Sequence, residues 1–142
     1  MNNRPLIGVG ILVVRHGKVL LGQRKGSLAE MSFELPGGHL EHAESFLACA
    51  KRELSEETGL VLVSLEFLCV SNFLISGKHY VDIDFLGRVL PGEAHVNEEQ
   101  KSVGWNWYDL DNLPSPLFEP AKLTISSYIE TEFACHDLVT EH

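Results

Sequence analysis

The chain has 142 residues, of which 44% are hydrophobic, and it carries a formal net charge of −9. This length and apolar content predict a single folded domain over residues 1–142 and exclude a disordered chain. The negative charge argues against a general nucleic-acid-binding protein, because such proteins need lysine and arginine to neutralise phosphates.

The N-terminal part predicts a β-hairpin followed by a loop. Leu6–Arg15 is rich in β-favouring aliphatic residues, a turn follows at 16–17, and Val19–Arg24 returns. The run Leu-Pro-Gly-Gly at 35–38 then combines a rigid proline with two permissive glycines. Such a loop lets the backbone approach a ligand or a metal closely.

An amphipathic helix is predicted over Glu44–Thr58. Its apolar residues recur on one stripe suited to the core, and these are Phe46, Leu47, Ala50 and Leu54. Gly59 suits the left-handed position that commonly ends a helix.

The rest of the chain predicts strands and one closing helix. Val61–Ile75 supplies one or two strands, and His79–Leu90 is a strand with alternating apolar residues at 81, 83 and 85. Val103–Tyr108 predicts a further strand, 109–116 a loop, and 121 to about 133 a helix. This order indicates one α/β unit.

Three glutamates crowd one face of the first predicted helix. Glu53, Glu56 and Glu57 stand at i, i+3 and i+4, within roughly 100° of helix surface. Like-charged pairs at this spacing cost an isolated helix about 0.2–0.5 kcal/mol each, so a helix without another task would interleave lysines. Divalent Mg²⁺ or Mn²⁺ removes the repulsion and prefers oxygen ligands. The spacing therefore predicts a metal site for a polyphosphate.

Arg52 lies next to this acidic face. It is placed to pair with Glu44 or Glu41, which would hold the preceding loop on the helix. We group Arg52 with the catalytic glutamates, in a structural role.

The segment from Gly38 to Leu60 resembles a complete Nudix box. Gly38 is followed after five residues by Glu44, after seven more by the triplet 52–54, and then by 56–57 and 59–60. This spacing is far more specific than a lone acidic helix. Outer segments resemble MutT-type nucleoside triphosphate pyrophosphohydrolases, in the branch that includes the oxidised-guanine and thiopurine nucleotide diphosphatase: 21–27, 35–41, 72–73, 79–80 and 105–107. The resemblance implies the Nudix fold, an α/β/α sandwich with a mixed central sheet and a loop-helix-loop catalytic motif.

The resemblance also implies a mechanism. Metal ions neutralise the anionic oxygens of a phosphoanhydride and orient an in-line water. The family pattern places Glu53, Glu56 and Glu57 around the metal, together with the backbone carbonyl of Gly37. A glutamate from a later loop often completes this set, and Glu98 is our candidate, with Glu99 as its close competitor. Glu53 is favoured as general base, although carboxylates around shared metals titrate as a group.

Several residues are candidates for substrate binding. Arg24 and Lys25 end the second predicted strand and suit a phosphate, although a solvated strand end is equally compatible with them. By resemblance, Gly38 and His39 lie near the phosphates, while Leu117 and Phe118 match a purine-packing position; a backbone-bonded histidine and a core aromatic are the plainer interpretations. Trp105 and Trp107 share a strand face, where one could border the base pocket, but helix packing is favoured for both.

The remaining features are those of an ordinary intracellular chain. The three cysteines, Cys49, Cys69 and Cys135, have no zinc-like spacing, and we expect reduced thiols. No apolar run approaches the ~18 residues of a membrane span, and the N-terminus lacks a secretory core. We therefore expect a cytoplasmic protein that contacts neither membrane nor nucleic acid.

Two classes of function fit these patterns. The leading hypothesis is a Mg²⁺-dependent hydrolase that converts a nucleoside triphosphate to the monophosphate and pyrophosphate. The alternative is a non-catalytic Nudix-fold module that senses a nucleotide or sugar nucleotide, which the intact acidic set disfavours. Within enzymes, an ADP-ribose or dinucleotide hydrolase is a further alternative. By resemblance a homodimer is expected.

Overall fold

The computed structural model describes residues 3–24, 31–94 and 102–139. The strands are β1 (Leu6–Leu12), β2 (Val14–Arg15), β3 (Lys18–Arg24), β4 (Phe33–Glu34), β5 (Gly37–His39), β6 (Leu62–Ile75), β7 (Lys78–Val89), β8 (Ser102–Asp109) and β9 (Ala134–Asp137). The helices are α1 (Phe46–Thr58) and α2 (Glu119–Glu130). Neither helix is long and apolar enough to cross a membrane, within the described part of the chain.

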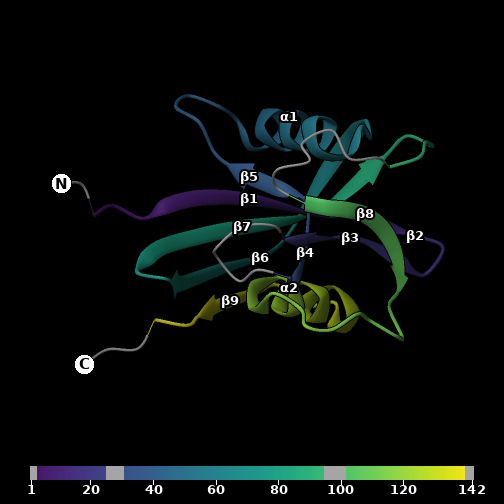
Figure 1. Ribbon diagram of the computed structural model, residues 1–142. Coiled ribbons are helices and arrows are strands. Elements are labelled where there is room, and N and C mark those ends of the chain that lie inside the picture. Colours follow the sequence, from purple (N-terminus) through teal and green to yellow (C-terminus); the bar gives the residue numbers. More distant parts are fainter. Residues whose placement is uncertain (1–2, 25–30, 95–101, 140–142) are drawn as a thin grey trace.

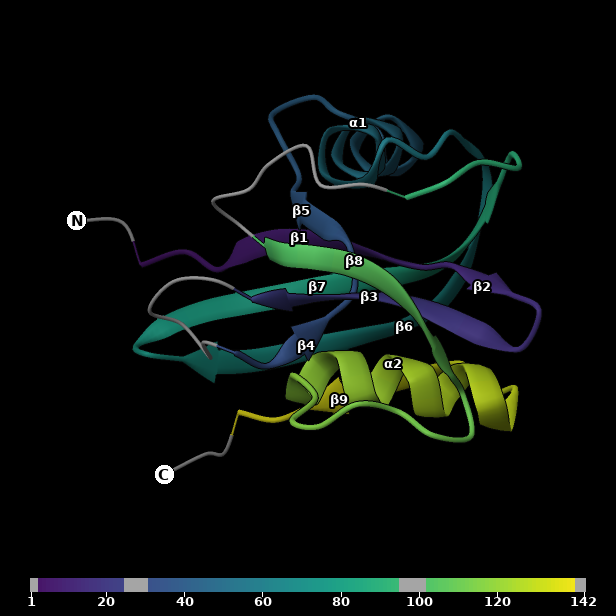
Figure 2. The ribbon, with the colours of Figure 1, turned by 45° about the vertical axis from the view of Figure 1, so that its right-hand side comes forward.

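The elements form three layers, with the strands between the two helices (Figure 1). α1 covers one side of the strands and α2 the opposite side, and the view turned by 45° shows the same order (Figure 2). The predicted α/β/α sandwich with a mixed sheet is therefore confirmed.

Two sheets make up the central layer. The larger has the order β5-β1-β7-β6-β9, in which β1 pairs in parallel with β7 and β7 pairs antiparallel with β6. In the smaller, β3 pairs antiparallel with β2, β4 and β8. The larger sheet places β1 and β7 at its centre, so residues on these strands can be buried on both faces.

Each helix covers its own hydrophobic core. The core below α1 combines Cys49, Ala50 and Leu54 with residues from the strands, namely Val9, Ile11, Val13, Leu20, Leu60, Leu62, Phe85 and Trp105. The core below α2 joins Ile125 to Leu12, Val19, Leu21, Leu68 and Cys69. Successive residues of β1 therefore serve opposite cores, as the two-residue period of a strand requires.

The predicted hairpin is only partly correct. Its tip forms as expected, because Val14 pairs with Val19 in the β2–β3 ladder. β1 instead pairs with β5 and β7, which are distant in sequence. The short strands β4 and β5, within a predicted loop, and the C-terminal β9 had no local pattern to reveal them, because each exists only through its partner strand.

Two details of the predicted helices also change. α1 begins at Phe46 rather than Glu44, and the side chains of Phe46 and Leu47 stay 41% and 39% exposed. The first turn projects past the core, and the buried face of α1 includes Glu53 and Glu57 instead. α2 begins earlier than predicted, at Glu119, and ends at Glu130 before β9.

Candidate active site

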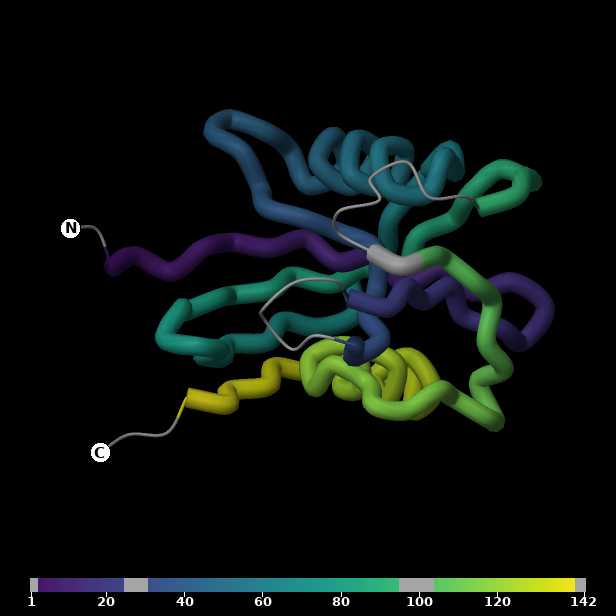
Figure 3. The backbone as a smooth tube through the Cα atoms, in the orientation of Figure 1, coloured from purple at the N-terminus to yellow at the C-terminus, as the bar shows by residue number. Residues whose placement is uncertain are grey.

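The loop after β5 and the helix α1 form one unit. In Figure 3 the chain leaves β5, makes a wide turn and comes back above the sheet as α1. The Ser45 side chain accepts a hydrogen bond from the Ala48 N–H at 3.0 Å, which satisfies a free donor at the helix start. At the other end, Gly59 adopts a left-handed φ of 77° and donates its N–H to the Ser55 carbonyl, as predicted.

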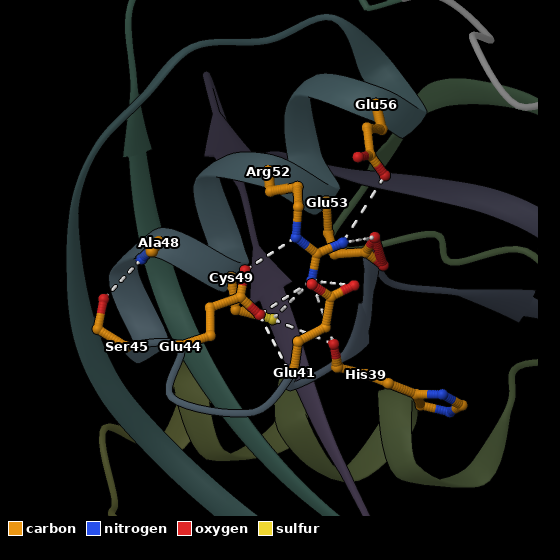
Figure 4. Close-up of polar contacts among 9 residues, drawn as sticks. All are labelled: His39, Glu41, Glu44, Ser45, Ala48, Cys49, Arg52, Glu53 and Glu56. Atoms are coloured by element: carbon orange, nitrogen blue, oxygen red, sulfur yellow. Dashed lines mark hydrogen bonds and ion pairs between the residues drawn. The ribbon is translucent and has the colours of Figure 1, made fainter.

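Arg52 ties the loop to the helix. Its Nε and Nη2 donate to the two carboxylate oxygens of Glu44 at 2.8 and 3.0 Å, and Nη2 also donates to the His39 carbonyl at 3.2 Å. Glu41 lies 3.8 Å away (Figure 4). The sequence predicts that Arg52 pairs with Glu44 or Glu41, and the structure places it within 4 Å of both, with Glu44 as the hydrogen-bonded partner. The hydrogen bonds from Arg52 lower the pKa of Glu44 to about 2, so this carboxylate stays ionised at neutral pH.

Arg52 also contacts the predicted metal ligands. Nη1 lies 2.9 Å from Glu53 Oε1 and 3.8 Å from Glu56 Oε2 (Figure 4). One guanidinium thus faces carboxylates of both the loop and the acidic helix face. Its positive charge reduces the electrostatic repulsion among these carboxylates.

Two of the three glutamates are buried against the glycine loop. Glu53 and Glu57 are 3% and 5% exposed, whereas the side chain of Glu56 is 44% exposed. Glu57 Oε1 accepts a hydrogen bond from the Gly37 N–H at 2.8 Å. A Cβ at Gly38 would overlap the Glu53 carboxylate, so only glycine allows this approach. The structure thus places Gly37 and Gly38 against the glutamates that the sequence singled out.

The donor chemistry of this unit fits a hard divalent cation. Buried carboxylates and a backbone carbonyl are the ligands that Mg²⁺ prefers. In the described part of the chain, no three His, Cys, Asp or Glu side chains already converge as a ligand set. Glu98 and Glu99 lie outside the described residues. The ligand roles of Gly37, Glu53, Glu56, Glu57 and Glu98 therefore stay predictions.

A cavity opens beside the glycine loop. Among the predicted substrate residues, Arg24, Gly38 and His39 line it together with Phe118, whereas Lys25 lies outside the described residues. The other described lining residues come mainly from β1, β6 and β7 and from the segments around the loop and α2: Gly8, Val9, Gly10, Glu34, Leu35, Pro36, Gly37, Phe73, Ile75, Tyr80, Asp82, Asp84, Pro120 and Ala121. The fold thus brings segments that are distant in the sequence to one cavity.

Both charged and aromatic side chains line this cavity. Arg24 Nη1 lies 2.5 Å from Glu34 Oε1, and its guanidinium stacks over the Phe118 ring at 4.8 Å. Phe118 contacts Phe73 edge-on at 6.0 Å, and Phe73 stacks on Tyr80 at 5.5 Å. We call the part of the cavity lined by Phe73, Tyr80 and Phe118 the aromatic compartment. Aromatic side chains suit contact with a flat ligand ring.

The tryptophans serve the core. Trp105 is 6% exposed in the core below α1, and Trp107 packs against that core beneath the Arg15 guanidinium at 4.7 Å. Neither lines the cavity described above. The favoured packing role agrees with these positions. Cys49 and Cys69 are buried and Cys135 is exposed, and all three are free thiols.

Sequence reasoning missed the acidic floor of the cavity, as we call the part of its lining formed by Asp82 and Asp84. Asp82 and Asp84 on β7 line it, and burial raises the pKa of Asp82 to about 7 and that of Asp84 to about 6. In the sequence they alternate with apolar residues, a pattern that does not distinguish a solvated strand face from a covered one. Only the presence of α2 above this face reveals that they are enclosed.

The chain matches the NUDIX domain family over residues 4–128. It is 31% identical over 121 residues to an ADP-ribose pyrophosphatase of Methanocaldococcus jannaschii, covering 84% of this chain and 70% of the relative. It is 28% identical over 142 residues to an oxidized purine nucleoside triphosphate hydrolase of Danio rerio, covering 93% and 89%.

A solved structure shows the same fold. The MutT NUDIX hydrolase from Burkholderia pseudomallei superposes with a TM-score of 0.82 at 31% identity, covering 87% of this chain and 98% of that one. The family match spans strands β1 to β8, the acidic helix α1 and nearly all of α2, and it ends before β9. The chain is therefore a member of the Nudix hydrolase family.

Proposed function

We propose that this protein is a divalent-metal-dependent pyrophosphohydrolase that converts a nucleoside triphosphate and water into the monophosphate and pyrophosphate. One observation carries the proposal: a single cavity extends from the Gly37–His39 loop, which lies on Glu53 and Glu57, to a compartment walled by Phe73, Tyr80 and Phe118. A triphosphate at the loop and a base against the aromatic side chains match these two ends.

The loop and α1 would perform the chemistry. Glu53, Glu56, Glu57 and the Gly37 carbonyl would hold Mg²⁺ or Mn²⁺, with Glu98 or Glu99 as the added ligand. The bound ion would supply charge neutralisation for the phosphate oxygens. Glu53 is our choice for the base that takes the proton of the attacking water, and Gly38 and His39 are placed to position the phosphates. Arg52 would act through Glu53, by fixing the position of its carboxylate.

The test is a panel of nucleoside triphosphates and ADP-ribose with Mg²⁺, in which pyrophosphate and orthophosphate are measured separately. We expect pyrophosphate release, and we expect Glu53→Gln and Glu57→Gln to lower kcat by about 100-fold or more. Glu66→Gln, on the exposed side of β6, is the matched control and should keep full activity. Unchanged turnover in both site variants would refute the assignment.

An ADP-ribose hydrolase is the second candidate, because the Methanocaldococcus jannaschii relative carries that activity in its name. Such an enzyme would cleave ADP-ribose to AMP and ribose 5-phosphate, without pyrophosphate. The product analysis of the same panel separates the two. Tight nucleotide binding without any hydrolysis would instead favour the sensor. The predicted homodimer is checked by sedimentation of the same samples.

A further inference from the structure

The acidic floor of the cavity, formed by Asp82 and Asp84, takes no part in the chemistry proposed at α1. Asp82 and Asp84 are two residues apart on β7, so both side chains emerge on the same face of the sheet. That face is the one below α2, since the Thr124 hydroxyl on α2 donates to Asp84 Oδ2. The apolar residues between and beside them, Ile83 and Phe85, face the core below α1.

Two glycines on β1 make room for these carboxyl groups. Gly8 pairs with Asp82 and Gly10 with Asp84 in the parallel β1–β7 ladder. A Cβ at either glycine would overlap the carboxylate oxygen of its partner. The two carboxyl groups therefore lie against glycine backbone of β1, where no side chain intervenes, and both line the cavity.

The two acids differ in their internal partners. Asp84 is 2% exposed and is held by the Thr124 hydroxyl and the Gly10 backbone. In the described part of the chain, Asp82 makes no such hydrogen bond. Asp84 is thus fixed by the fold, whereas the carboxyl group of Asp82 is left to face the cavity.

Next to Asp82 lies a second polar group for which the described residues supply no hydrogen-bond partner. Ser71 on β6 pairs with Asp82 across the antiparallel ladder, so the two side chains lie on the same face. Ser71 is 0% exposed, and its hydroxyl has no hydrogen-bond partner among the described residues. Buried polar groups in native proteins are nearly always hydrogen-bonded. Asp82 thus lines the cavity, and directly beside it lies a buried hydroxyl group that no described residue satisfies.

The charge of the cavity floor selects the kind of ligand. Three carboxyl groups line the described cavity, those of Glu34, Asp82 and Asp84, against the single guanidinium of Arg24, which is engaged by Glu34 and Phe118. An excess of acceptors in a buried site repels phosphate and favours a ligand that presents N–H donors. The phosphates thus belong at the glycine loop and the base at this floor.

We propose that Asp82 determines base specificity by accepting hydrogen bonds from two adjacent N–H groups, as presented by a guanine-type 2-amino-6-oxopurine. This inference rests on the proposed function, since it assigns the base end of the same cavity. The ring N1–H and the 2-amino group of guanine match the two oxygens of one carboxylate, whereas adenine presents an unprotonated nitrogen at N1. Asp84 acts as a positioning residue. Burial, followed by the negative charges of Asp84 and Glu34, raises the pKa of Asp82, so that binding of the two donors draws Asp82 into its ionised form.

The test compares GTP with ITP, which lacks only the 2-amino group. With Mg²⁺, we expect the wild-type chain to prefer GTP by about 10-fold or more in kcat/KM, chiefly through KM. Asp82→Asn should reduce this preference to about 1 because the amide cannot accept two hydrogen bonds in parallel. Asp111→Asn, in an exposed turn, is the matched control and should keep the wild-type ratio. An unchanged GTP-to-ITP ratio in a folded Asp82→Asn variant would overturn the proposal.

A binding measurement separates this proposal from the hydrolase assignment. Calorimetric titration with GMP and IMP in the absence of metal needs no catalysis, so it decides the role of Asp82 even if no triphosphate is hydrolysed. Tighter binding of GMP that is lost in Asp82→Asn supports the proposal. Equal affinities of the wild-type chain for GMP and IMP refute it.

Discussion

At the scale of single residues, Arg52 and Asp82 show opposite ways of keeping acids inside a small domain. Around Arg52, one guanidinium lies within 4 Å of carboxylate oxygens of Glu41, Glu44, Glu53 and Glu56. Its hydrogen bonds keep Glu44 ionised well below neutral pH. Asp82 accepts no such hydrogen bond from the described residues, and burial together with Asp84 and Glu34 favours its neutral form. The first arrangement suits a permanent charge and the second suits a group that changes protonation when a ligand binds.

Asp82 leads to a prediction about stability and pH. Its pKa is raised from 3.8 to about 7, so between these values the folded state binds more protons than the unfolded state. Stability contributed by the neutral form is complete below about pH 4 and is lost as pH rises towards 7. We expect Asp82→Asn to raise the free energy of unfolding by about 1–2 kcal/mol at pH 8, with no gain near pH 4.

Urea unfolding of both proteins at the two pH values provides the measurement. The charged groups facing Asp82 are Asp84, Glu34 and Arg24, and they are the same in both proteins. A variant that is equally stabilised at both pH values would contradict the titration of Asp82 in this range.

At the scale of elements, the contact between the glycine loop and α1 decides the geometry of the catalytic group. α1 is fixed by its Ser45 cap and its Gly59 end, and the loop is fixed by the β1–β5 ladder, in which Gly37 pairs with Gly10. Between them, Gly38 meets Glu53 with no space for a side chain. The position of the Glu53 carboxylate therefore depends on the absence of a side chain at Gly38.

Gly38→Ala tests this contact. The added methyl group must displace the Glu53 carboxylate, and a shift of about 1 Å in a catalytic group costs on the order of 100-fold in rate. We expect kcat/KM for pyrophosphate release to fall by about that factor. Gly104→Ala, where a Cβ meets no atom of the described residues within 4 Å, is the control. Wild-type activity in the Gly38 variant would show that Glu53 is not positioned by this contact.

At the scale of the whole molecule, the fold separates two kinds of acidic site on opposite faces of one sheet. The glutamates of α1 lie on one side, and the aspartates of β7 lie below α2 on the other. The cavity is lined by the aspartates and by the Gly37–His39 loop, and the glycines of this loop contact Glu57 and Glu53 of α1. Phosphate chemistry and base recognition can thus use carboxylates without forming one repulsive cluster.

Metal binding provides the corresponding prediction for the whole molecule. Because Glu53 and Glu57 are buried, a cation that pairs with them should stabilise the folded state. At 100 times its dissociation constant, Mg²⁺ would add about 2.7 kcal/mol to the free energy of unfolding. We expect Mg²⁺ to raise Tm and EDTA to reverse the rise, together with loss of hydrolysis.

The double variant Glu53→Gln, Glu57→Gln is the control, and its Tm should not respond to Mg²⁺. An equal rise in Tm in the wild-type chain and the double variant would place the bound ion elsewhere.

The sequence by itself determined the features that depend on local spacing. The acidic face at Glu53, Glu56 and Glu57, the Gly59 helix end and the pairing of Arg52 with Glu44 all follow from neighbours along one helix and its preceding loop. The same box identified the family and, with the order of elements, the layered α/β fold.

Only the tertiary structure decided which residues face the substrate cavity. β5 and β9 exist through strands distant in sequence, and Asp82 and Asp84 are enclosed only because α2 packs over them and Gly8 and Gly10 leave space beside them. An alternating strand pattern is the same whether its polar face meets water or another layer. Burial, which turns these aspartates from surface groups into candidates for base recognition, is a property of the packed layers and not of the strand.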